Sequence, residues 1–558
     1  MGIKTMTRRE TYRNPVISGF YPDPSICYDG NNYYIVNSSF YYFPGLPVFQ
    51  SKDLVHWKQI GNAISRPEQL DYKNCDSSEG LWAATIRYLD NKYYIVNTLD
   101  VNGRKNRYNY IITADTPSGP WSNAVIIHNA GGIDPSLFFD DDGRMWFCAN
   151  RIPDKELFPS HKQIYLVELD KNSFQMIGEP TVIYDAVVDH SMYMEGPHIY
   201  HIHDWYYLLT AEGGTQTNHC VKFYRSRKLQ GPYEPCPRNP IVTNRHIKLI
   251  NTTGVSVTGH GDLVEYAPDK YAMVLLGIRP YEKNIDPFKY EIHRKWIREP
   301  DRNKKAQFNL GRETFLVRIA FDYDDWPIIE NDNGLVNINE IRPDLREYIF
   351  PMQSRIDNFE NSELGLEWCM RRPPIKEFYS LSERPGYLRL HLQKESSEST
   401  STPAMILRRQ QHYYFQAGVA MEFESENENE EAGLILTQNE GYSYLLLKKN
   451  ESNHDTLACI KVENGHREVI NKVQIPKGRI YLTIEGHKET YNFYYGLRER
   501  ETIAISESVD ASLLSTIVAD GYLGTMIGMY ASGMGHNSNN DADFDWFRYE
   551  LLNTDDTY

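Results

Sequence analysis

Three carboxyl residues and a histidine occupy matching places in a pattern that repeats along the first 330 residues. Asp23, Asp134, Glu195 and His260 each lie ten or eleven positions before an aromatic or apolar run, and Ala83 has this place in the remaining repeat. Asp23 and Asp134 both open the triplet Asp-Pro-Ser. Because corresponding positions of a ring of repeats face a common axis, we expect these side chains to converge on one pocket.

Such a set of carboxyl groups suits glycoside hydrolysis. One carboxylic acid protonates the leaving oxygen, and a second carboxylate activates water or attacks the sugar carbon. A third carboxylate nearby raises the pKa of the acid by repulsion and keeps it protonated. Each Asp-Pro pair taken alone is as well explained by a simple turn. The joint placement favours catalysis, because like charges crowded near an axis cost stability unless they have a use.

Five further residues are candidates for binding a substrate. Arg279 and Arg312 are suited to hold a carboxylate or a sugar hydroxyl through charged hydrogen bonds, and a surface salt bridge is the alternative for each. Trp82 starts the second repeat, where an indole would form a platform for a sugar, and Phe40 would wall the same pocket. Core packing explains both aromatic residues equally well. His260 is either a hydrogen-bonded structural residue or part of the site.

The elements that must position these residues are short strands. Each repeat contains an apolar strand, a polar turn, an aromatic strand and an outer strand, which is typical of antiparallel propeller blades. The aromatic runs are at 33–36, 93–96, 145–147, 205–209 and 271–275. The pattern predicts a five-bladed β-propeller over residues 1–330, with 310–327 supplying the outer strands of the last blade.

The rest of the chain predicts a second β domain. Residues 331–352 are polar and rich in Asn, Asp and Pro, as in a linker or a strap across the surface. Residues 353–558 contain stretches of alternating apolar and polar residues, such as 388–392 and 419–423, which are typical of half-buried strands. We therefore expect an all-β protein in which a β-sandwich follows the propeller.

Composition limits the function further. The formal net charge of −16 argues against nucleic acid or an anionic membrane as a partner, and the 41 tyrosines suit contacts with neutral sugars. The seven scattered cysteines indicate neither a disulfide framework nor a zinc site. No signal peptide, long apolar span or phosphate-binding, serine-hydrolase or zinc-protease motif occurs. We expect a cytoplasmic protein, or a periplasmic or secreted one if an export signal was removed. We expect no required cofactor, and no macromolecular partner other than further copies of the same chain.

The chain resembles glycoside hydrolase family 43, the inverting β-xylosidases and α-L-arabinofuranosidases. Nearly the whole chain is covered. The motifs that carry the likeness are at 14–16, 21–25, 82–87, 134–138, 195–198, 211–215, 310–314, 378–390 and 543–547.

The resemblance implies roles for individual residues. Asp23 matches the general base, Glu195 the general acid, and Asp134 the residue that modulates the pKa of the acid and orients it. Arg312 matches an arginine of the substrate pocket. His260 matches a histidine of the central channel, which in some members binds a calcium ion or its waters. Tyr522 is the nearest match to an aromatic residue, often Phe in relatives, that a loop of the sandwich places at the pocket mouth.

The sequence thus predicts an exo-acting, inverting hydrolase. It would release terminal β-D-xylose or α-L-arabinofuranose from oligosaccharides of plant hemicellulose, by a single displacement in which Asp23 and Glu195 act as base and acid. Two alternatives stay open at this point. One is a retaining, fructosidase-like hydrolase on a similar fold, and the other is a propeller that binds carbohydrate without cleaving it.

Overall fold

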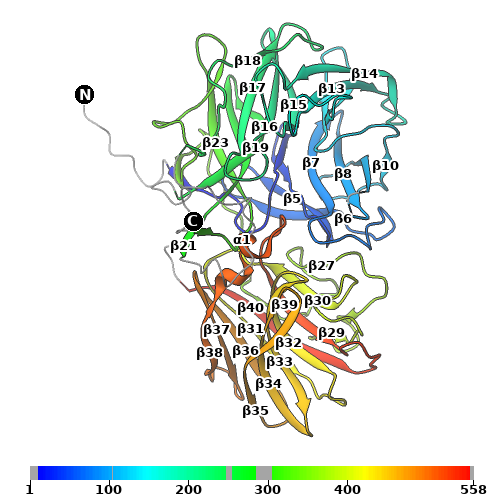
Figure 1. Ribbon diagram of the computed structural model, residues 1–558, viewed down its shortest axis with the longest axis vertical. Coiled ribbons are helices and arrows are strands. Elements are labelled where there is room, and N and C mark those ends of the chain that lie inside the picture. The colour runs from blue at the N-terminus through cyan, green and yellow to red at the C-terminus, as the bar shows by residue number, and fades with distance from the viewer. Residues whose placement is uncertain (1–10, 104, 247–253, 284–304, 353, 553–558) are drawn as a thin grey trace, which may run out of the picture.

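The computed structural model describes residues 11–103, 105–246, 254–283, 305–352 and 354–552. These residues are 51% strand and 2% helix, which confirms the expected all-β class. They form two bodies, a propeller and a β-sandwich, with the single α-helix of the described residues at their junction (Figure 1). None of the described helices has the length and apolar character needed to cross a membrane.

Five four-stranded antiparallel sheets make up the propeller, as the repeats predict. Within each blade the strands pair in chain order, and each of the five equivalent positions of the repeats lies in the first strand or just before it. Blade one contains β2 (Ser25–Tyr28), β3 (Tyr33–Val36), β5 (Gly45–Ser51) and β6 (Lys58–Ile64); blade two β7 (Gly80–Leu89), β8 (Lys92–Val101), β9 (Asn106–Ala114) and β10 (Val125–Ile126); blade three β11 (Ser136–Phe139), β12 (Met145–Arg151), β13 (Gln163–Leu169) and β14 (Met176–Asp185); blade four β15 (Glu195–Ile202), β16 (Trp205–Glu212), β17 (Cys220–Ser226) and β18 (Glu234–Pro235); blade five β19 (Ser256–Ala267), β20 (Lys270–Ile278), β23 (Glu313–Phe321) and β24 (Pro327–Ile329).

Apolar side chains between neighbouring blades hold the ring together. Ile35 and Phe49 of blade one share a buried cluster with Val274 and Leu316 of blade five. Burial of one such side chain contributes roughly 1.5–3 kcal/mol. Each blade is therefore stable only beside its neighbours, which explains why the repeats occur as a closed set of five.

The first and last propeller segments meet where the ring closes. β1 (Thr11–Arg13) pairs with β25 (Asn339–Ile341), which lies in the segment expected as a linker or strap. The Asn14 side chain donates to the carbonyl of Leu316 and accepts from its amide, both at 2.9 Å. These contacts tie the chain just before blade one to blade five, and so hold the segment that carries Asp23.

Two antiparallel sheets form the sandwich, as expected. One sheet contains β28 (Tyr379–Ser380), β29 (Leu388–His391), β40 (Asp541–Leu551), β31 (Tyr414–Glu422), β36 (Ile480–His487), β37 (Thr490–Gly496) and β38 (Ile503–Asp510), with β26 (Ile356–Asp357) paired to β40; the other contains β30 (Ala404–Arg409), β39 (Met526–Ser532), β32 (Glu431–Asn439), β33 (Tyr442–Glu451), β34 (His454–Glu463) and β35 (His466–Gln474). Between β38 and β39 lie the 3₁₀ helix η3 (Ala511–Leu514), the helix α1 (Thr516–Ala519) and the loop 520–525.

Buried contacts fix the sandwich against blades one and five. β27 (Met370–Arg371) pairs with β4 (Tyr42–Phe43) of the propeller, and β22 (Lys305–Gln307), which pairs with β21 (Tyr281–Lys283), lies next to α1. Arg409 of the sandwich donates its Nε hydrogen to the carbonyl of Phe20 at 2.6 Å. The loop 520–525 is thereby held over the end of the propeller at which the first strands begin.

Candidate active site

A pocket of about 420 Å³ lies at this end of the propeller. Eight of the nine residues expected in the site line it: Asp23, Phe40, Trp82, Asp134, Glu195, His260, Arg312 and Tyr522. The remaining lining residues are Ala83, Ile133 and Thr215. All five blades contribute to the pocket, and Tyr522 comes from the sandwich. The convergence expected from the repeats is therefore present.

An unusual backbone conformation recurs at equivalent places in the pocket. Asp23, Asp134 and His260 have φ of 52°, 51° and 49°, in the left-handed region that side chains rarely adopt. In the fourth blade the left-handed residue is Gly196, beside Glu195, with φ of 55°. Such strain persists where the surrounding structure enforces it, and it clusters at functional sites. The same local turn thus presents a pocket residue in blades one, three and five.

The Asp23 carboxylate is buried and paired. It accepts a hydrogen bond from Arg312 Nη1 at 2.8 Å and another from the Ser38 hydroxyl. Burial alone would raise the pKa of Asp23, but Arg312, His260 and the Ser38 hydrogen bond together hold it below its ordinary value. Asp23 is therefore ionised over the whole physiological pH range.

Glu195 and Asp134 show the opposite behaviour. Burial and the negative charge of Asp23 raise the pKa of Glu195 to about 7, against the opposing charges of Lys162 and Arg312. Burial and the charge of Glu195 raise the pKa of Asp134 well above its ordinary value. Two carboxyl groups in one pocket therefore resist ionisation while the third is ionised, which separates acid from base.

Aromatic rings close one side of the pocket. Phe40 stacks on Tyr522 with ring centroids 5.9 Å apart, and the Arg312 guanidinium lies 5.6 Å from the centroid of each ring. The Tyr522 amide donates to the Ser78 hydroxyl at 2.9 Å, and the Trp82 indole donates to the Ser78 carbonyl at 3.2 Å. The sandwich loop is thereby fixed as one wall of the pocket.

The structure corrects the expectation for Arg279. Its guanidinium forms a two-pronged ion pair with the Glu313 carboxylate, with both N–O distances 2.8 Å, and does not line the pocket. Glu313 is fully buried and also accepts from the Gly19 amide at 2.9 Å. Arg279 therefore neutralises a buried carboxylate beside blade one, and substrate binding as its role was wrong.

Comparison with known proteins agrees with this geometry. Residues 12–327 match the family described as glycosyl hydrolases family 43, and residues 356–550 match the domain described as beta xylosidase C-terminal concanavalin A-like domain. The chain belongs to glycoside hydrolase family 43. The resemblance of the motifs is thus confirmed, and the protein is a glycosidase that acts on oligosaccharides.

Relatives of this family 43 enzyme include proteins with named activities. The chain is 36% identical to a non-reducing end alpha-L-arabinofuranosidase of Bacteroides ovatus, covering 98% of this chain and 96% of the relative. It is 33% identical to a beta-xylosidase of Bacillus subtilis, covering 96% and 99%. Among solved structures, the family 43 protein BlXynB of Bacillus licheniformis has 32% identity and a TM-score of 0.85 over 97% of this chain and 100% of that one.

Several residues in or next to the pocket of this family 43 enzyme were not among the site residues predicted from the sequence. Thr215 lies in a motif that marks the family, and Ala83 holds the equivalent place of the second blade, so both had a usable signal. Ile133 is next to Asp134 in the chain, and no repeated pattern in the sequence marks it as a pocket residue. Nothing in the sequence marks Ser38 or Lys162, because their approach to the carboxylates depends on how the chain folds back.

His260 belongs to neither of the described clusters of His, Cys, Asp and Glu side chains that could hold a metal ion. The buried imidazole has a lowered pKa, chiefly because of burial, and is neutral. Calcium prefers six to eight oxygen ligands. The carboxylates acting on His260 are those of Asp23 and Asp262, which are already paired with Arg312 and Arg87. Calcium near His260 stays a prediction.

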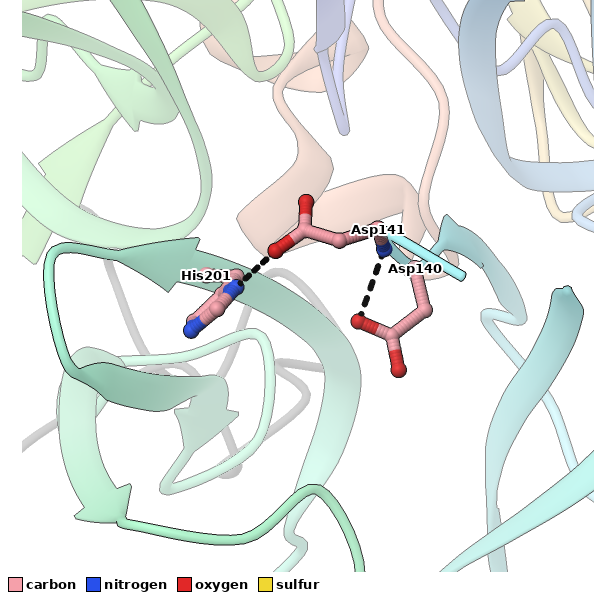
Figure 2. Close-up of side chains that lie close together, drawn as sticks. All are labelled: Asp140, Asp141 and His201. Carbon is pink, nitrogen blue, oxygen red and sulfur yellow. Dashed lines mark hydrogen bonds and ion pairs between the residues drawn. The ribbon is translucent and has the colours of Figure 1, made fainter. Parts of the chain in front are cut away.

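One exposed group with metal-ligand chemistry lies elsewhere on the propeller. Asp140 and Asp141, in the turn after β11, approach His201 of β15, whose Nδ1 lies 2.7 Å from an Asp141 oxygen (Figure 2). His201 also stacks on Tyr206, whose hydroxyl donates to Asp140 at 3.1 Å. The turn is at the opposite end of β11 from Asp134. These contacts join blades three and four and have no part in the pocket.

Proposed function

We propose that this enzyme removes a terminal β-D-xylose or α-L-arabinofuranose from oligosaccharides of plant hemicellulose, with inversion at the anomeric carbon. The supporting observation is one pocket lined by an ionised Asp23 together with Glu195 and Asp134, whose pKa values are raised. The relatives named as β-xylosidase and non-reducing end arabinofuranosidase support the choice of sugar.

Asp23 is the general base of the proposed reaction. Its carboxylate takes a proton from a water molecule as the water oxygen attacks the anomeric carbon. Arg312 and Ser38 hold the carboxylate in one orientation through their hydrogen bonds. Both the charge and the direction of the base are thereby set before the substrate arrives.

Glu195 is the general acid. It gives its proton to the glycosidic oxygen as the bond from that oxygen to the anomeric carbon breaks. Burial and the negative charge of Asp23 oppose early ionisation of Glu195, and Asp134, whose pKa is also raised, is assigned the role of modulating and orienting the acid. Water and leaving group are on opposite faces of the sugar, so the configuration inverts in one displacement.

Exo action follows from the wall made by Tyr522. Phe40, Tyr522 and Trp82 line the pocket together, and the stacked rings of Phe40 and Tyr522 would block a polymer from continuing on that side. A sugar at the end of a chain can enter, whereas an internal sugar would carry substituents on both sides. The proposed substrate is therefore the non-reducing end of a short chain.

Replacing Tyr522 with alanine should weaken binding of the terminal sugar. The variant loses the ring that stacks on Phe40, and such aromatic contacts contribute roughly 0.5–1.5 kcal/mol, so KM for nitrophenyl xyloside should rise up to about tenfold. Tyr522→Phe keeps the ring and serves as the matched control. An unchanged KM in Tyr522→Ala would contradict a role of this wall in binding.

A substrate panel with analysis of the product tests the function as a whole. Nitrophenyl xyloside and arabinofuranoside should be cleaved, and proton NMR during the first turnovers should show release of the inverted anomer. A retained anomer would exclude the proposed mechanism and favour the fructosidase-like alternative. Membership of family 43 argues against the second alternative, a propeller that only binds carbohydrate. Cytoplasmic location and homo-oligomer formation stay predictions.

A further inference from the structure

Asp262 lies inside the propeller, two residues after His260 in β19, and its side chain is fully buried. Its two carboxylate oxygens accept hydrogen bonds from the Ser25 hydroxyl at 2.6 Å, the Ile26 amide at 3.0 Å, the Arg87 guanidinium at 2.7 and 3.1 Å and the Tyr200 hydroxyl at 2.6 Å. We call these residues, with His198, the Asp262 network. His198 belongs to it through a contact of 2.9 Å from its Nδ1 to Arg87.

The Asp262 network joins four of the five blades at one carboxylate. Ser25 belongs to blade one, Arg87 to blade two, Tyr200 to blade four and Asp262 to blade five. Blade three is joined separately, because the Thr85 hydroxyl of blade two donates to the carbonyl of Pro135 at 2.8 Å. Each first strand is therefore held to another blade by polar contacts, whose direction and length are more restrictive than those of apolar packing.

The contacts lie very close to the pocket residues along the chain. Ser25 is two residues after Asp23, and Pro135 follows Asp134 directly. His198 is three residues after Glu195. A displacement of any member would therefore move a pocket carboxylate by a comparable amount, because the connecting backbone is short and buried.

Electrostatics alone gives little reason for this arrangement. Burial would raise the pKa of Asp262, and the charge of Arg87 and the other contacts hold it far below its ordinary value. A buried ion pair is weak evidence of stabilisation, because proteins in which apolar residues replace such a pair are often as stable. A polar pair does, however, restrict the geometry of the residues that form it. The fixed geometry is thus the property that the network adds to the fold.

We propose that the Asp262 network sets the distance between Asp23 and Glu195, with Arg87, Tyr200 and Asp262 as positioning residues. The proposal rests on the base and acid roles given above. An inverting hydrolase needs its two carboxyl groups roughly 6.5–9.5 Å apart to leave room for the water. Loss of one network contact would change that separation without touching substrate.

Tyr200→Phe is the decisive variant, because it removes a single hydroxyl and leaves the Arg87 and Asp262 charges paired. We expect kcat on xylobiose to fall about tenfold while KM stays within about twofold of the wild type. Displacement of a catalytic group by one ångström can lower the rate by about a hundredfold, and loss of one hydroxyl should cause a smaller displacement. The alkaline limb of the kcat/KM profile should also move to lower pH. Glu195 faces Asp23, Asp134, Lys162 and Arg312, and repulsion from Asp23 weakens if the two carboxylates separate.

Tyr207→Phe is the matched control. Tyr207 is a buried tyrosine of the same blade, and its hydroxyl donates to the backbone carbonyl of Asp325, away from the pocket. We expect its melting temperature to fall as in Tyr200→Phe while kcat and the pH profile stay as in the wild type. Asp262→Asn, if it folds, should lose about a hundredfold in kcat.

Two results would overturn the proposal. One is a Tyr200→Phe enzyme with wild-type kcat and an unshifted alkaline limb, and the other is an equal loss of kcat in Tyr207→Phe. Asp23→Asn and Glu195→Gln, measured in parallel, separate this failure from failure of the proposed function. If those two variants are inactive and Tyr200→Phe is normal, only the positioning role is wrong.

Discussion

Replacing Asp23 with asparagine is expected to lower kcat by about 10²–10⁴-fold, the usual contribution of a general base. The amide keeps the shape of the side chain and still offers an oxygen to Arg312, but it cannot take a proton from water. Because the base acts on water and not on the leaving group, the loss should be similar for xylobiose and for nitrophenyl xylosides. Initial rates on both substrates at saturating concentration measure it.

The same substitution at Asp142 provides a control for Asp23→Asn. Asp142 is an exposed aspartate in the turn after β11, at the far end of the blade from the pocket, so Asp142→Asn should keep wild-type rates. Thermal melting of both variants checks that loss of the partner of Arg312 has not unfolded the protein. A folded Asp23→Asn enzyme within about tenfold of the wild type would contradict the base assignment.

Replacing Glu195 with glutamine should give a loss that depends on the leaving group. Xylobiose has a poor leaving group that needs a proton, so its kcat/KM should fall by about 10²–10⁴-fold. A dinitrophenyl xyloside leaves as a stable anion and should be much less affected. Equal losses on the two substrates would argue that Glu195 does not donate the proton. Glu179→Gln, at an exposed position of β14, is the control.

The pH profile gives a second test of Glu195. Its acid form is the active one and its pKa is about 7, so kcat/KM of the wild type should fall as the pH rises through about 7. The Asp23 base has a pKa below its ordinary value, so activity should persist on the acid side down to the pH at which Asp23 takes a proton. The alkaline limb should be absent in Glu195→Gln. Its persistence there would assign the limb to another group.

The sequence was sufficient for the fold and for most of the pocket. Aromatic runs at a regular spacing predict blades because each strand must bury apolar side chains against a neighbour, and equivalent positions then converge by symmetry. This is why Asp23, Asp134 and Glu195 were found together. Tyr522 could be placed only through its resemblance to a family motif, since the docking of the sandwich is not visible in any local pattern.

The two arginines show where the sequence did not suffice. Arg279 follows β20 and Arg312 precedes β23, and these neighbouring strands pair in register from Gly277 and Glu313 onward. Both arginines are therefore near the pocket in the chain, but one turns to Glu313 and the other to Asp23. The choice depends on which buried carboxylate each side chain reaches. The partners of Asp262 escaped prediction for the same reason, because they come from three other blades.

The position of Tyr522 has a consequence for synthesis of the enzyme. The residue that walls the pocket lies late in the chain, and β40 after it supplies a central strand of the larger sheet, between β29 and β31. A ribosome must therefore translate the sequence as far as residue 522 before the pocket can have this wall. A product that ends before Tyr522 would carry all three carboxylates and still lack one wall of the binding site.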